Sequence, residues 1–515
     1  AYLSRVDLIV HGTTITTNAV ITRRYAKTGY LTTKGFKDIL NSRRGLKRNA
    51  FTAKESPPPP IVPQLLVRVA EERIDRRGKV LVPLQESDVR DAAAHFRAEG
   101  VEAVAVAFMF SFLNDAHERR AREILEGELP GVYVTTSARV LPQVRFYERG
   151  STAVFNACVG PLLRGYIKDL QATLAEGGFT GRLLTMQSNG GVMSPEVVMD
   201  FAANTLLSGP ASGPVAAGYF ARQHRLRDLI TIDMGGTSLD ASVMRDGRAS
   251  MTDRSEVAEY ALALPSLDIN AIGAGGGSIA SVEEGGILRV GPESAGAAPG
   301  PAAYGMGGEH ATVTDANLVL GNLNPDFFLG GARRLDKTLA EAAIRKDVAE
   351  PLGVDLLAAA AGIIGLVNAQ MANGVRRVSI ARGFDPRDAA LVAAGGAGPL
   401  HACGLADDLD LDLILVPRTS SVLCATGMLV TDLRHDIVRY ASIRLDDPGA
   451  AAALSGLCRE LVEQGRRILI EEQVSKTRQR FEFSCDMQFE GQFNVLETRL
   501  PQLDAGQATG RKIDE

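Results

Sequence analysis

A turn of glycines at the end of an apolar strand limits the folds open to this chain more than any other feature. It lies in "TIDMGGTSLDASV", residues 231–243. The strand delivers Asp233 to its end, and Gly235 and Gly236 let the backbone turn with no Cβ in the way. Polar and apolar residues alternate after the turn, which is typical of a second strand. The unit is therefore predicted to be a β-hairpin, unlike the strand–turn–helix unit of a P-loop.

The chemistry of this turn is suited to a phosphate group. Thr237 and Ser238 place hydroxyls beside backbone N–H groups, and turns of this kind bind anions. A carboxylate two residues before the glycines, Asp233, can hold a hydrated Mg²⁺ against phosphates or orient an attacking water. An ordinary hairpin with an exposed aspartate has the same pattern, so the turn alone does not decide between the two.

A second glycine turn follows in "VAAGGAGPLHA", residues 392–402. Gly395, Gly396 and Gly398, with Ala397 among them, separate a buried apolar strand from the start of a helix. The absence of side chains lets a flat group, such as a purine with its ribose, lie against the main chain. The order of the two turns resembles the phosphate-then-adenosine arrangement of the actin, sugar-kinase and heat-shock ATPase superfamily.

Length and composition indicate an ordinary globular protein of several domains. The 515 residues exceed the roughly 250 to 300 at which single cores stop growing, so two or three domains are expected. The net charge of -5 lacks the basic excess that a nucleic acid or an anionic membrane surface would attract, and neither partner is predicted. The most apolar runs, 103–113 and 356–367, are shorter than the roughly 18 residues of a membrane span and are predicted to be buried.

Cysteine and histidine usage suggests no metal or disulfide framework. The five cysteines are scattered without any CxxC pair, so buried, reduced thiols are expected. None of the seven histidines has metal-binding spacing. No charged and apolar leader opens the sequence, and a cytoplasmic location is the default expectation.

Helix and strand patterns alternate along the chain, which predicts a mixed α/β fold. A proline-rich stretch, "SPPPPIVP" at 56–63, is predicted to be an extended spacer because proline lacks the N–H and fixes φ. Strands are predicted at 6–10, 28–33 and 101–112, and helices at 86–100, 115–129, 151–178, 336–348, 356–376 and 449–473.

A longer series of motifs resembles one branch of the superfamily named above. In chain order the motifs are "HGTTITTNAV", "TGYLTTKGFKDIL", "YERGSTAVFNACV", "MQSNGGVMS", "LLSGPASGPVAAG", "GAGGGSIASVEEGGILRVGPESAGAAPGPAAYG" and "VTDANLVLGNLNPDFFLGG". With the two glycine turns, they are similar to the hydantoinase A / 5-oxoprolinase family over residues 6 to about 435. That family consists of ATP-dependent enzymes and includes subunits of acetone and acetophenone carboxylases.

The resemblance implies an α/β fold with two actin-like (ribonuclease H-like) lobes around an ATP cleft. The first lobe is expected at residues 1–205, with an inserted α/β subdomain at about 64–140, and the second at 206–440. A smaller α+β region, expected to be incomplete, covers 441–515. Family members begin earlier, with another GGT turn preceded by Asp, so we expect that this sequence lacks that segment.

The resemblance also implies roles for individual residues. Asp233, Thr13 and Thr14 are the expected catalytic residues, and Asp233 is the expected Mg²⁺ ligand. His11 and Asn18 are expected to contact substrate. ATP is expected to contact three glycine turns, through Gly235, Gly236, Thr237, Ser238, Gly275, Gly276, Gly395, Gly396, Ala397 and Gly398.

Several of these assignments have a structural alternative. The hydroxyls of Thr13, Thr14, Thr16 and Thr17 can contact substrate or a γ-phosphate, or they can belong to a strand end that caps a helix near Thr17. His11 can bind substrate or serve as a hydrogen-bonded scaffold residue.

Other positions in the glycine-rich middle of the chain leave similar choices. Gly275 and its neighbours can approach phosphate or permit close backbone packing. Asp268 and Asp315 can bind a cation or lie in solvated loops. Two residues depart from the family pattern: Ala303 stands where members often carry Cys, and Asn270 where they often carry His. The departures put in doubt a thiol role at the first position and a proton-transfer or metal role at the second.

The expected activity is ATP-driven activation of a carbonyl oxygen. Phosphorylation of the oxygen of a cyclic amide makes it a good leaving group, so that water can open the ring. The resemblance implies a B-type (hydantoinase B-like) partner subunit and therefore a hetero-oligomer. Three alternatives stay open: a subunit of a carboxylase that acts on a ketone and bicarbonate, a sugar-kinase-like phosphotransferase, and a non-catalytic nucleotide-switched binding module.

Overall fold

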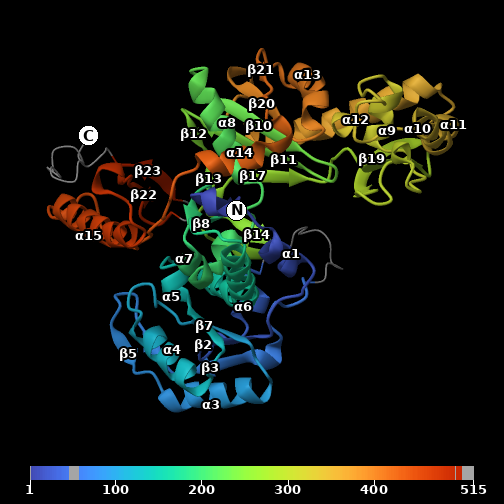
Figure 1. Ribbon diagram of the computed structural model, residues 1–515. Helices are drawn as coiled ribbons and strands as arrows, with labels where there is room; N and C mark the ends of the chain where they lie inside the picture. The colour runs from blue at the N-terminus through green and yellow to red at the C-terminus, as the bar shows by residue number, and fades with distance from the viewer. Residues whose placement is uncertain (1, 46–56, 493–494, 501–515) are drawn as a thin grey trace. The chain divides into compact units, whose positions relative to one another are not determined.

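The computed structural model describes residues 2–45, 57–492 and 495–500 of the chain. Its contacts divide the chain into two compact units, each built from two stretches of sequence, whose elements are labelled in Figure 1. Unit 1 is Ala1–Ala26 with Cys158–Arg434, and unit 2 is Lys27–Ala157 with His435–Glu515.

The borders of the units differ from the predicted domain borders at residues 205 and 440. Unit 1 contains parts of both predicted lobes, because backbone hydrogen bonds join them. The Leu267 N–H donates to the Ser188 carbonyl at 2.9 Å, and the Val192 N–H donates to the Asp432 carbonyl at 3.1 Å.

The largest sheet of unit 1 is mixed and contains the predicted hairpin. Its strand order is β12-β11-β10-β20-β21, and β17 also pairs with β11. The strands are β10 (Leu229–Met234), β11 (Leu239–Arg245), β12 (Arg248–Ala249), β17 (Ile269–Ile272), β20 (Ala390–Ala394) and β21 (Ile414–Leu415). Strands β10 and β11 pair in antiparallel register, which confirms the β-hairpin. Strand β20 lies parallel to β10.

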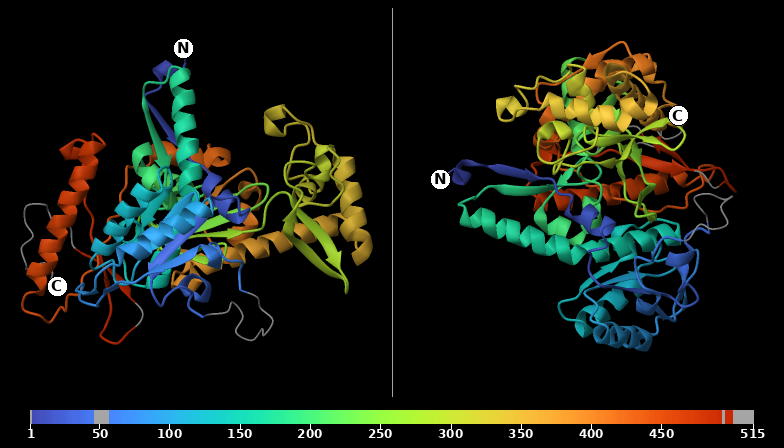
Figure 2. Two further views of the ribbon diagram at one scale, coloured as in Figure 1. Left: turned by 90° about the horizontal axis from the view of Figure 1, so that it is seen from below. Right: turned by 90° about the vertical axis from the view of Figure 1, so that its right-hand side faces the viewer.

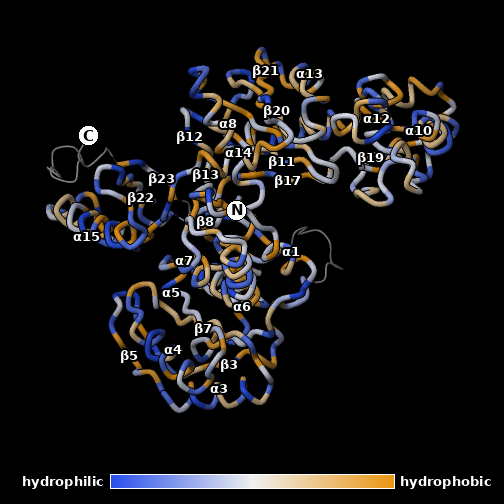
Figure 3. Tube along the Cα trace, viewed as in Figure 1, coloured by the Kyte–Doolittle hydropathy of each residue, from blue (hydrophilic) through white to orange (hydrophobic). Residues whose placement is uncertain are grey.

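A long helix, α12 (Leu356–Val378), packs one face into the main core of unit 1. Its buried residues include Ile363, Val367, Met371 and Val375, which recur at helical spacing. The remaining faces carry small and polar residues together with a few leucines, of which Leu357 is exposed, and Figure 3 colours the trace of this unit by hydropathy. By length and composition alone, the segment Leu356–Arg382 could cross a membrane. The apolar run predicted from the sequence, 356–367, is shorter than a membrane span. The buried face of α12 agrees with the sequence prediction that this segment belongs to the core.

Residues 278–352 form a group of elements beside α12, as both views in Figure 2 show. The group contains the hairpin of β18 (Ser278–Glu283) and β19 (Ile287–Ser294), with helices α9 (Val313–Val319) and α10 (Lys337–Ile344). The predicted helix at 336–348 is α10 followed by a π-helical turn, Arg345–Ala349.

The N-terminal stretch of unit 1 pairs with a distant part of the sequence. Strand β1 (Leu8–His11) lies parallel to β8 (Arg182–Met186), which pairs with β9 (Val192–Met193). Helix α1 (Ile15–Ile21) follows directly after the threonine-rich turn. It begins at Ile15, before Thr17, the residue near which the structural alternative in the sequence places a capped helix start.

Unit 2 contains a four-stranded parallel sheet with the order β3-β2-β6-β7. The strands are β2 (Thr28–Thr33), β3 (Val67–Ala70), β6 (Ala103–Ala107) and β7 (Tyr133–Thr136), and helices α3 (Glu86–Ala98) and α4 (Ala116–Glu128) pack against them. These elements confirm the predicted α/β rhythm of this region. Of the proline-rich stretch, residues 57–63 are described, and they form neither helix nor strand.

A buried glutamate and a buried arginine share hydrogen-bond partners near the end of this sheet. The Glu118 carboxylate accepts hydrogen bonds from the Phe108 N–H (2.8 Å), the Ala138 N–H (2.8 Å) and the Ser137 hydroxyl (2.6 Å). Arg149 donates to the Ser137 hydroxyl, the Phe108 carbonyl and the Gln143 carbonyl. Both side chains are almost fully buried, and their hydrogen bonds are the compensation that buried charges require.

The C-terminal part of unit 2 holds helix α15 (Ala450–Glu471) and the two-stranded sheet of β22 (Ser484–Met487) and β23 (Leu496–Arg499). The helix predicted at 449–473 is therefore confirmed.

Candidate functional site

The two predicted glycine turns lie side by side at one edge of the unit 1 sheet. They follow the parallel strands β10 and β20, in which Asp233 lies opposite Ala394. The Ala397 N–H donates to the Met234 carbonyl at 3.0 Å, so the second turn folds over the end of β10. Gly395 has φ +85°, and a Cβ there would lie 2.2 Å from the Met234 carbonyl oxygen and 2.6 Å from Asp233 Oδ1. Only glycine permits this approach.

The third glycine turn packs directly on the first. The Gly276 N–H donates to the Gly235 carbonyl (3.0 Å), and the Gly277 N–H donates to the Gly236 carbonyl (2.7 Å). A Cβ on Gly275 would lie 2.6 Å from the carbonyl carbon of Gly236. Of the two roles open to Gly275 and Gly276 from the sequence, the structure shows close backbone packing, and contact with ATP stays a prediction.

Open space lies in front of both turns. A Cβ added to Gly235, Gly236 or Gly396 would meet no atom within 4 Å. In the part of the chain that the structure describes, the N–H groups of Gly236 and Thr237 have no hydrogen-bond acceptor, whereas the Gly235 N–H is bonded to the Ser238 carbonyl at 3.0 Å. Free N–H groups beside open space are the arrangement that binds an anion.

Two carboxylates face each other under these turns. Asp233 and Asp240 are directly opposite in the β10–β11 pair, so their side chains lie on the same face of the sheet. Burial raises the pKa of Asp233, and burial together with the charge of Asp233 raises the pKa of Asp240 to about 6. Among the described residues, neither carboxylate forms an ion pair with Lys, Arg or His, so a cation from outside the chain would relieve their repulsion.

The donor set of this carboxylate pair fits Mg²⁺. The described residues contain no group of three or more His, Cys, Asp or Glu side chains that could hold a metal alone. Magnesium in nucleotide sites uses one or two carboxylates, and phosphate oxygens and waters complete its octahedron. Asp240 was not among the residues singled out from the sequence as ligands. Its position in the alternating strand, across the hairpin from Asp233, is the signal that could have identified it.

A thiol is the direct partner of Asp233. Cys424 Sγ lies 3.3 Å from Asp233 Oδ2, on helix α14 (Leu423–Val430). Burial, and secondly the charge of Asp233, raises the pKa of Cys424 to about 12, so the thiol keeps its proton and donates. The sequence pattern gave no indication of this contact, because Cys424 and Asp233 lie far apart along the chain.

Two of the four threonine hydroxyls of this turn hold the chain's own backbone, and a third contacts another side chain of the fold. Thr13 Oγ1 accepts from the Ile15 N–H (3.2 Å), and Thr17 Oγ1 accepts from the Leu207 N–H (3.0 Å). Thr16 Oγ1 lies 2.9 Å from Thr205 Oγ1. Thr14, the residue directly before helix α1, forms no side-chain cap of that helix. The turn therefore fastens α1 to residues 205–207, rather than capping a helix near Thr17.

Two predicted site residues of this turn remain exposed. Thr14 Oγ1 accepts a hydrogen bond from Asn18 Nδ2 at 3.2 Å, and both side chains face solvent. Helix α14 connects this turn to the carboxylate pair, because Cys424 contacts Asp233 and Met428, one turn later, lies against Gly12. The structure thus brings the turn and Asp233 to one helix, while the catalytic roles of Thr13 and Thr14 and the substrate role of Asn18 stay predictions.

The histidines near these turns are hydrogen-bonded scaffold residues. His11 Nε2 lies 2.8 Å from the Tyr166 hydroxyl, and burial lowers the pKa of His11. His401 Nδ1 lies 2.8 Å from Asn368 Oδ1, and burial lowers the pKa of His401 to about 4. Both rings are therefore neutral at pH 7, and a substrate contact by His11 stays a prediction.

The other carboxylates considered from the sequence have structural partners. Asp315 forms a capping box with Thr312 at the start of α9 and accepts from the Ala303 N–H at 2.7 Å. Asp268 pairs with Arg382 at 3.2 Å. Asn270, at the position where the family often has His, donates to the Gly374 carbonyl at 3.2 Å. None of these contacts points to a cation site.

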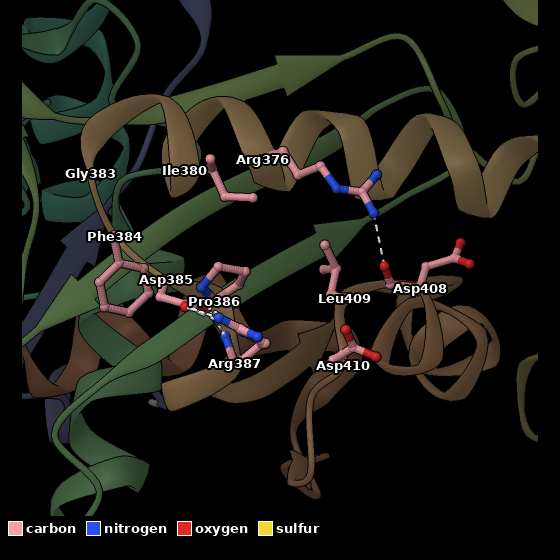
Figure 4. Close-up of a pocket in the computed structure, with 10 residues that line it drawn as sticks. All are labelled: Arg376, Ile380, Gly383, Phe384, Asp385, Pro386, Arg387, Asp408, Leu409 and Asp410. Atoms are coloured by element: carbon pink, nitrogen blue, oxygen red, sulfur yellow. Dashed lines mark hydrogen bonds and ion pairs between the residues drawn. The ribbon is translucent and has the colours of Figure 1, made fainter.

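A separate hollow of about 430 Å³ lies at the other end of β20, near its first residue. Figure 4 shows its lining side chains, from the end of α12, the loop before β20 and the end of helix α13 (Gly398–Leu409). Both arginines are engaged: Arg376 donates to the Asp408 carbonyl at 2.8 Å, and Arg387 pairs with Asp385 at 2.6 Å. None of the site residues predicted from the sequence lines this hollow.

Comparison with known proteins identifies the family. The family model for hydantoinase/oxoprolinase matches residues 149–437, and the model for the N-terminal region of the same family matches residues 2–129. The chain therefore belongs to the hydantoinase/oxoprolinase family, and the resemblance seen in the motifs is confirmed.

Relatives and solved structures agree with this assignment. The caprolactamase subunit alpha of Pseudomonas jessenii is 40% identical over 498 residues, which cover 96% of this chain and 72% of the relative. The crystal structure of the ATP-dependent caprolactamase from that organism matches with a TM-score of 0.89 at 38% identity, over 99% of this chain and 75% of the other. A nucleotide-free acetone carboxylase structure matches with a TM-score of 0.77 at 28% identity, over 97% and 73%. The mixed α/β fold is thus shared with both enzymes.

Proposed function

We propose that this chain is the ATP-binding subunit of an enzyme that phosphorylates the carbonyl oxygen of a cyclic amide and so drives opening of the ring by water. The observation that carries the proposal is the meeting of two glycine turns, with open space before them, over the pair Asp233 and Asp240. The likeness to a caprolactamase, an enzyme whose name denotes a cyclic amide, supports the class of substrate.

In this proposal, different residues would bind the metal, the phosphates and the adenosine of MgATP. Asp233 and Asp240 would hold Mg²⁺, which neutralises charge on the phosphates when bound. The N–H groups of Gly236 and Thr237 would donate to phosphate oxygens, and the turn from Gly395 to Gly398 would lie against adenosine. In this proposal the β10–β11 hairpin belongs to the second of two actin-like lobes, and the cleft between the lobes holds ATP.

Phosphorylation solves a chemical difficulty of lactams. The carbonyl carbon of an amide is a poor electrophile, and nitrogen is a poor leaving group. Transfer of the γ-phosphoryl group to the carbonyl oxygen makes the carbonyl carbon a better electrophile, so water can add to it. The ring nitrogen then takes up a proton and the C–N bond breaks, which leaves an acyl phosphate. A second water hydrolyses the acyl phosphate to the carboxylate and phosphate. The chain's contribution is positioning and charge neutralisation, as in other phosphoryl transfers.

A second candidate is a subunit of a ketone carboxylase, which would activate a ketone oxygen and bicarbonate in the same way. The likeness to acetone carboxylase favours this alternative. Both candidates imply a B-type partner subunit, a hetero-oligomer and a cytoplasmic location. A sugar-kinase-like phosphotransferase would instead need a small hydroxylated acceptor, and a nucleotide-switched binding module would release a partner protein without any small substrate.

The test is ATP hydrolysis by the chain purified together with a B-type subunit from the same source. ADP release is compared with caprolactam, hydantoin, 5-oxoproline, and acetone with bicarbonate. Stimulation by one cyclic amide supports the first candidate, and stimulation only by the ketone with bicarbonate supports the second. Absence of substrate-dependent ADP release with all four would refute both.

A further inference from the structure

The Asp233 carboxylate lies between two helix starts rather than beside a basic residue. Helix α14 contributes Cys424, whose thiol donates to Oδ2 at 3.3 Å. Helix α8 (Ser212–Gln223) contributes Gly213, where a Cβ would lie 3.6 Å from the Cys424 sulfur and 4.0 Å from Oδ2. The N-terminal turns of helices carry partial positive charge, which favours a carboxylate at this place.

The two helices hold Cys424 in a fixed position. A Cβ on Gly427 of α14 would lie 1.9 Å from the Ser212 carbonyl oxygen, so the helices approach as closely as glycine permits. The Ser212 hydroxyl is fully buried, lies beside the Cys424 sulfur and forms no hydrogen bond of normal geometry in the described structure. The thiol is therefore packed between α8 and Asp233, with little freedom to turn away.

The two oxygens of Asp233 have different surroundings. Oδ2 is on the side of Cys424, and Oδ1 is on the side of the second glycine turn, 2.6 Å from where a Cβ of Gly395 would lie. The packed thiol on Oδ2 restrains the side-chain torsion of Asp233, although an S–H group is a weaker donor than an N–H or O–H group. With Oδ2 held, Oδ1 stays on the side where the open space and the free N–H groups are found.

We propose that Cys424 is a positioning residue: its thiol holds Asp233 Oδ2, so that the carboxylate keeps the orientation in which it receives the metal of a metal–nucleotide complex. The inference rests on the proposed function, because it needs Asp233 to be a ligand of that metal. It adds a residue that contacts neither nucleotide nor substrate and acts only through Asp233. Partners that orient metal ligands in this way contribute about 10- to 100-fold to metal affinity or activity.

A purely structural role for Cys424 makes a different prediction. If the side chain only fills space between α8 and α14, any change there weakens all nucleotide binding equally or lowers the melting temperature. If the thiol orients Asp233, the loss appears only in the part of nucleotide affinity that depends on the metal. The ratio of the Kd for ATP in EDTA to the Kd for ATP with Mg²⁺ separates the two roles.

The experiment measures this ratio by calorimetry for the full chain and four variants. Cys424→Ala removes the donor, and Cys424→Ser keeps a donor at nearly the same place. Cys403→Ala, at an exposed cysteine on α13, is the matched control. Asp233→Asn shows the ratio expected when the metal ligand itself is lost. Melting temperatures of all five proteins are recorded with the same samples.

We expect Cys424→Ala to lower the ratio about tenfold, Cys424→Ser to stay within about twofold of the wild type, and Cys403→Ala to change nothing. An unchanged ratio in Cys424→Ala, or an equal loss in Cys424→Ser, overturns the inference. If Asp233→Asn brings the ratio of the two Kd values close to one while Cys424→Ala leaves it unchanged, the positioning role of Cys424 is refuted and the proposed function is not. If the wild type itself binds ATP equally with and without Mg²⁺, the proposed function falls as well.

Discussion

Two acidic sites in this molecule, one fully buried and one half-buried, are built in opposite ways. In unit 2, Glu118 accepts three hydrogen bonds, and Arg149 supplies the compensating charge in the same pocket. In unit 1, Asp233 and Asp240 lie opposite each other, and the only hydrogen bond that the structure shows to either side chain among the described residues comes from a thiol. The first group completes its own network, whereas the second leaves its charge uncompensated.

The difference indicates which group is structural and which binds a ligand. A charge that is removed from water without a partner lowers the free energy of unfolding. Such charges are typical of functional sites, where a bound ligand supplies the missing partner. Glu118 has no open space to fill, while the turns above Asp233 border space that no atom of the chain occupies. An acidic side chain near the end of a sheet is thus part of the core in unit 2 and a candidate metal ligand in unit 1.

The largest expected effect is loss of turnover on changing Asp233. Asp233→Asn removes the charge that holds Mg²⁺ while keeping the size and the contact to Cys424. We expect substrate-dependent ATP hydrolysis by the complex to fall at least about 1,000-fold, with no loss in melting temperature. Full retention of hydrolysis in a folded variant would remove Asp233 from the chemistry, and with it the contrast with Glu118.

The opposite pattern is expected at Glu118. Glu118→Gln leaves Arg149 without a nearby counter-charge in the core, and a buried charge left uncompensated in this way costs about 3 to 5 kcal/mol of unfolding free energy. Denaturant unfolding measures the loss. The control is Glu126→Gln, which breaks a surface pair with Arg122 and should cost no more than about 0.5 kcal/mol. A cost at Glu118 as small as that at Glu126 would show that its network is not needed for the fold.

Asp240 gives the sharpest form of the comparison, because removal of its charge should stabilise the protein. Its folded pKa, about 6, lies above its ordinary value of 3.8, so the folded state binds the proton more tightly than the unfolded state. The resulting stability is complete below pH 3.8 and is lost as the pH rises through about 6. At pH 7.5 the ionised carboxylate is therefore a cost.

We expect Asp240→Asn to raise the unfolding free energy by about 2 kcal/mol at pH 7.5 and to reduce the fall in stability between pH 4 and 6, while the raised pKa of Asp233 keeps part of that fall. The same variant should bind MgATP less tightly. Denaturant unfolding at several pH values and calorimetric titration with MgATP test the two halves. Lower stability at pH 7.5 would place Asp240 with Glu118 among structural acids.

The sequence allowed prediction of those parts of the site that are local. The hairpin around Gly235 and Gly236 and the strand–turn–helix around Gly395 follow from short-range patterns, because glycine placement and residue alternation act over a few residues. The contacts of Asp233 with Cys424 and of Thr16 with Thr205 join segments far apart in the chain. No periodicity in one sequence encodes such pairs, so they became visible only in the folded chain.

The fold shows the same division between local and distant features. The helices at 86–100, 115–129 and 449–473 were predictable, because each has a continuous amphipathic pattern. The composition of the two compact units was not, because it depends on hydrogen bonds such as that between Val192 and Asp432. Helix α1 begins before Thr17, near which the sequence allowed a helix cap, because the threonines that hold the turn to residues 205–207 have the pattern of a capped strand end.

The smallest effects are expected in the threonine-rich turn, where Thr16 is a structural residue and Thr14 is a candidate contact to substrate. Thr16 is buried against Thr205, so Thr16→Val should lower the unfolding free energy by about 0.5 to 1 kcal/mol and leave turnover unchanged. Thr205 keeps a second acceptor, the Ala202 carbonyl at 2.7 Å, which limits the cost. Thr14 is exposed, so Thr14→Val should leave stability unchanged. If Thr14 touches substrate, the KM for the lactam or kcat changes, and unchanged values for both would leave the turn with a structural role alone.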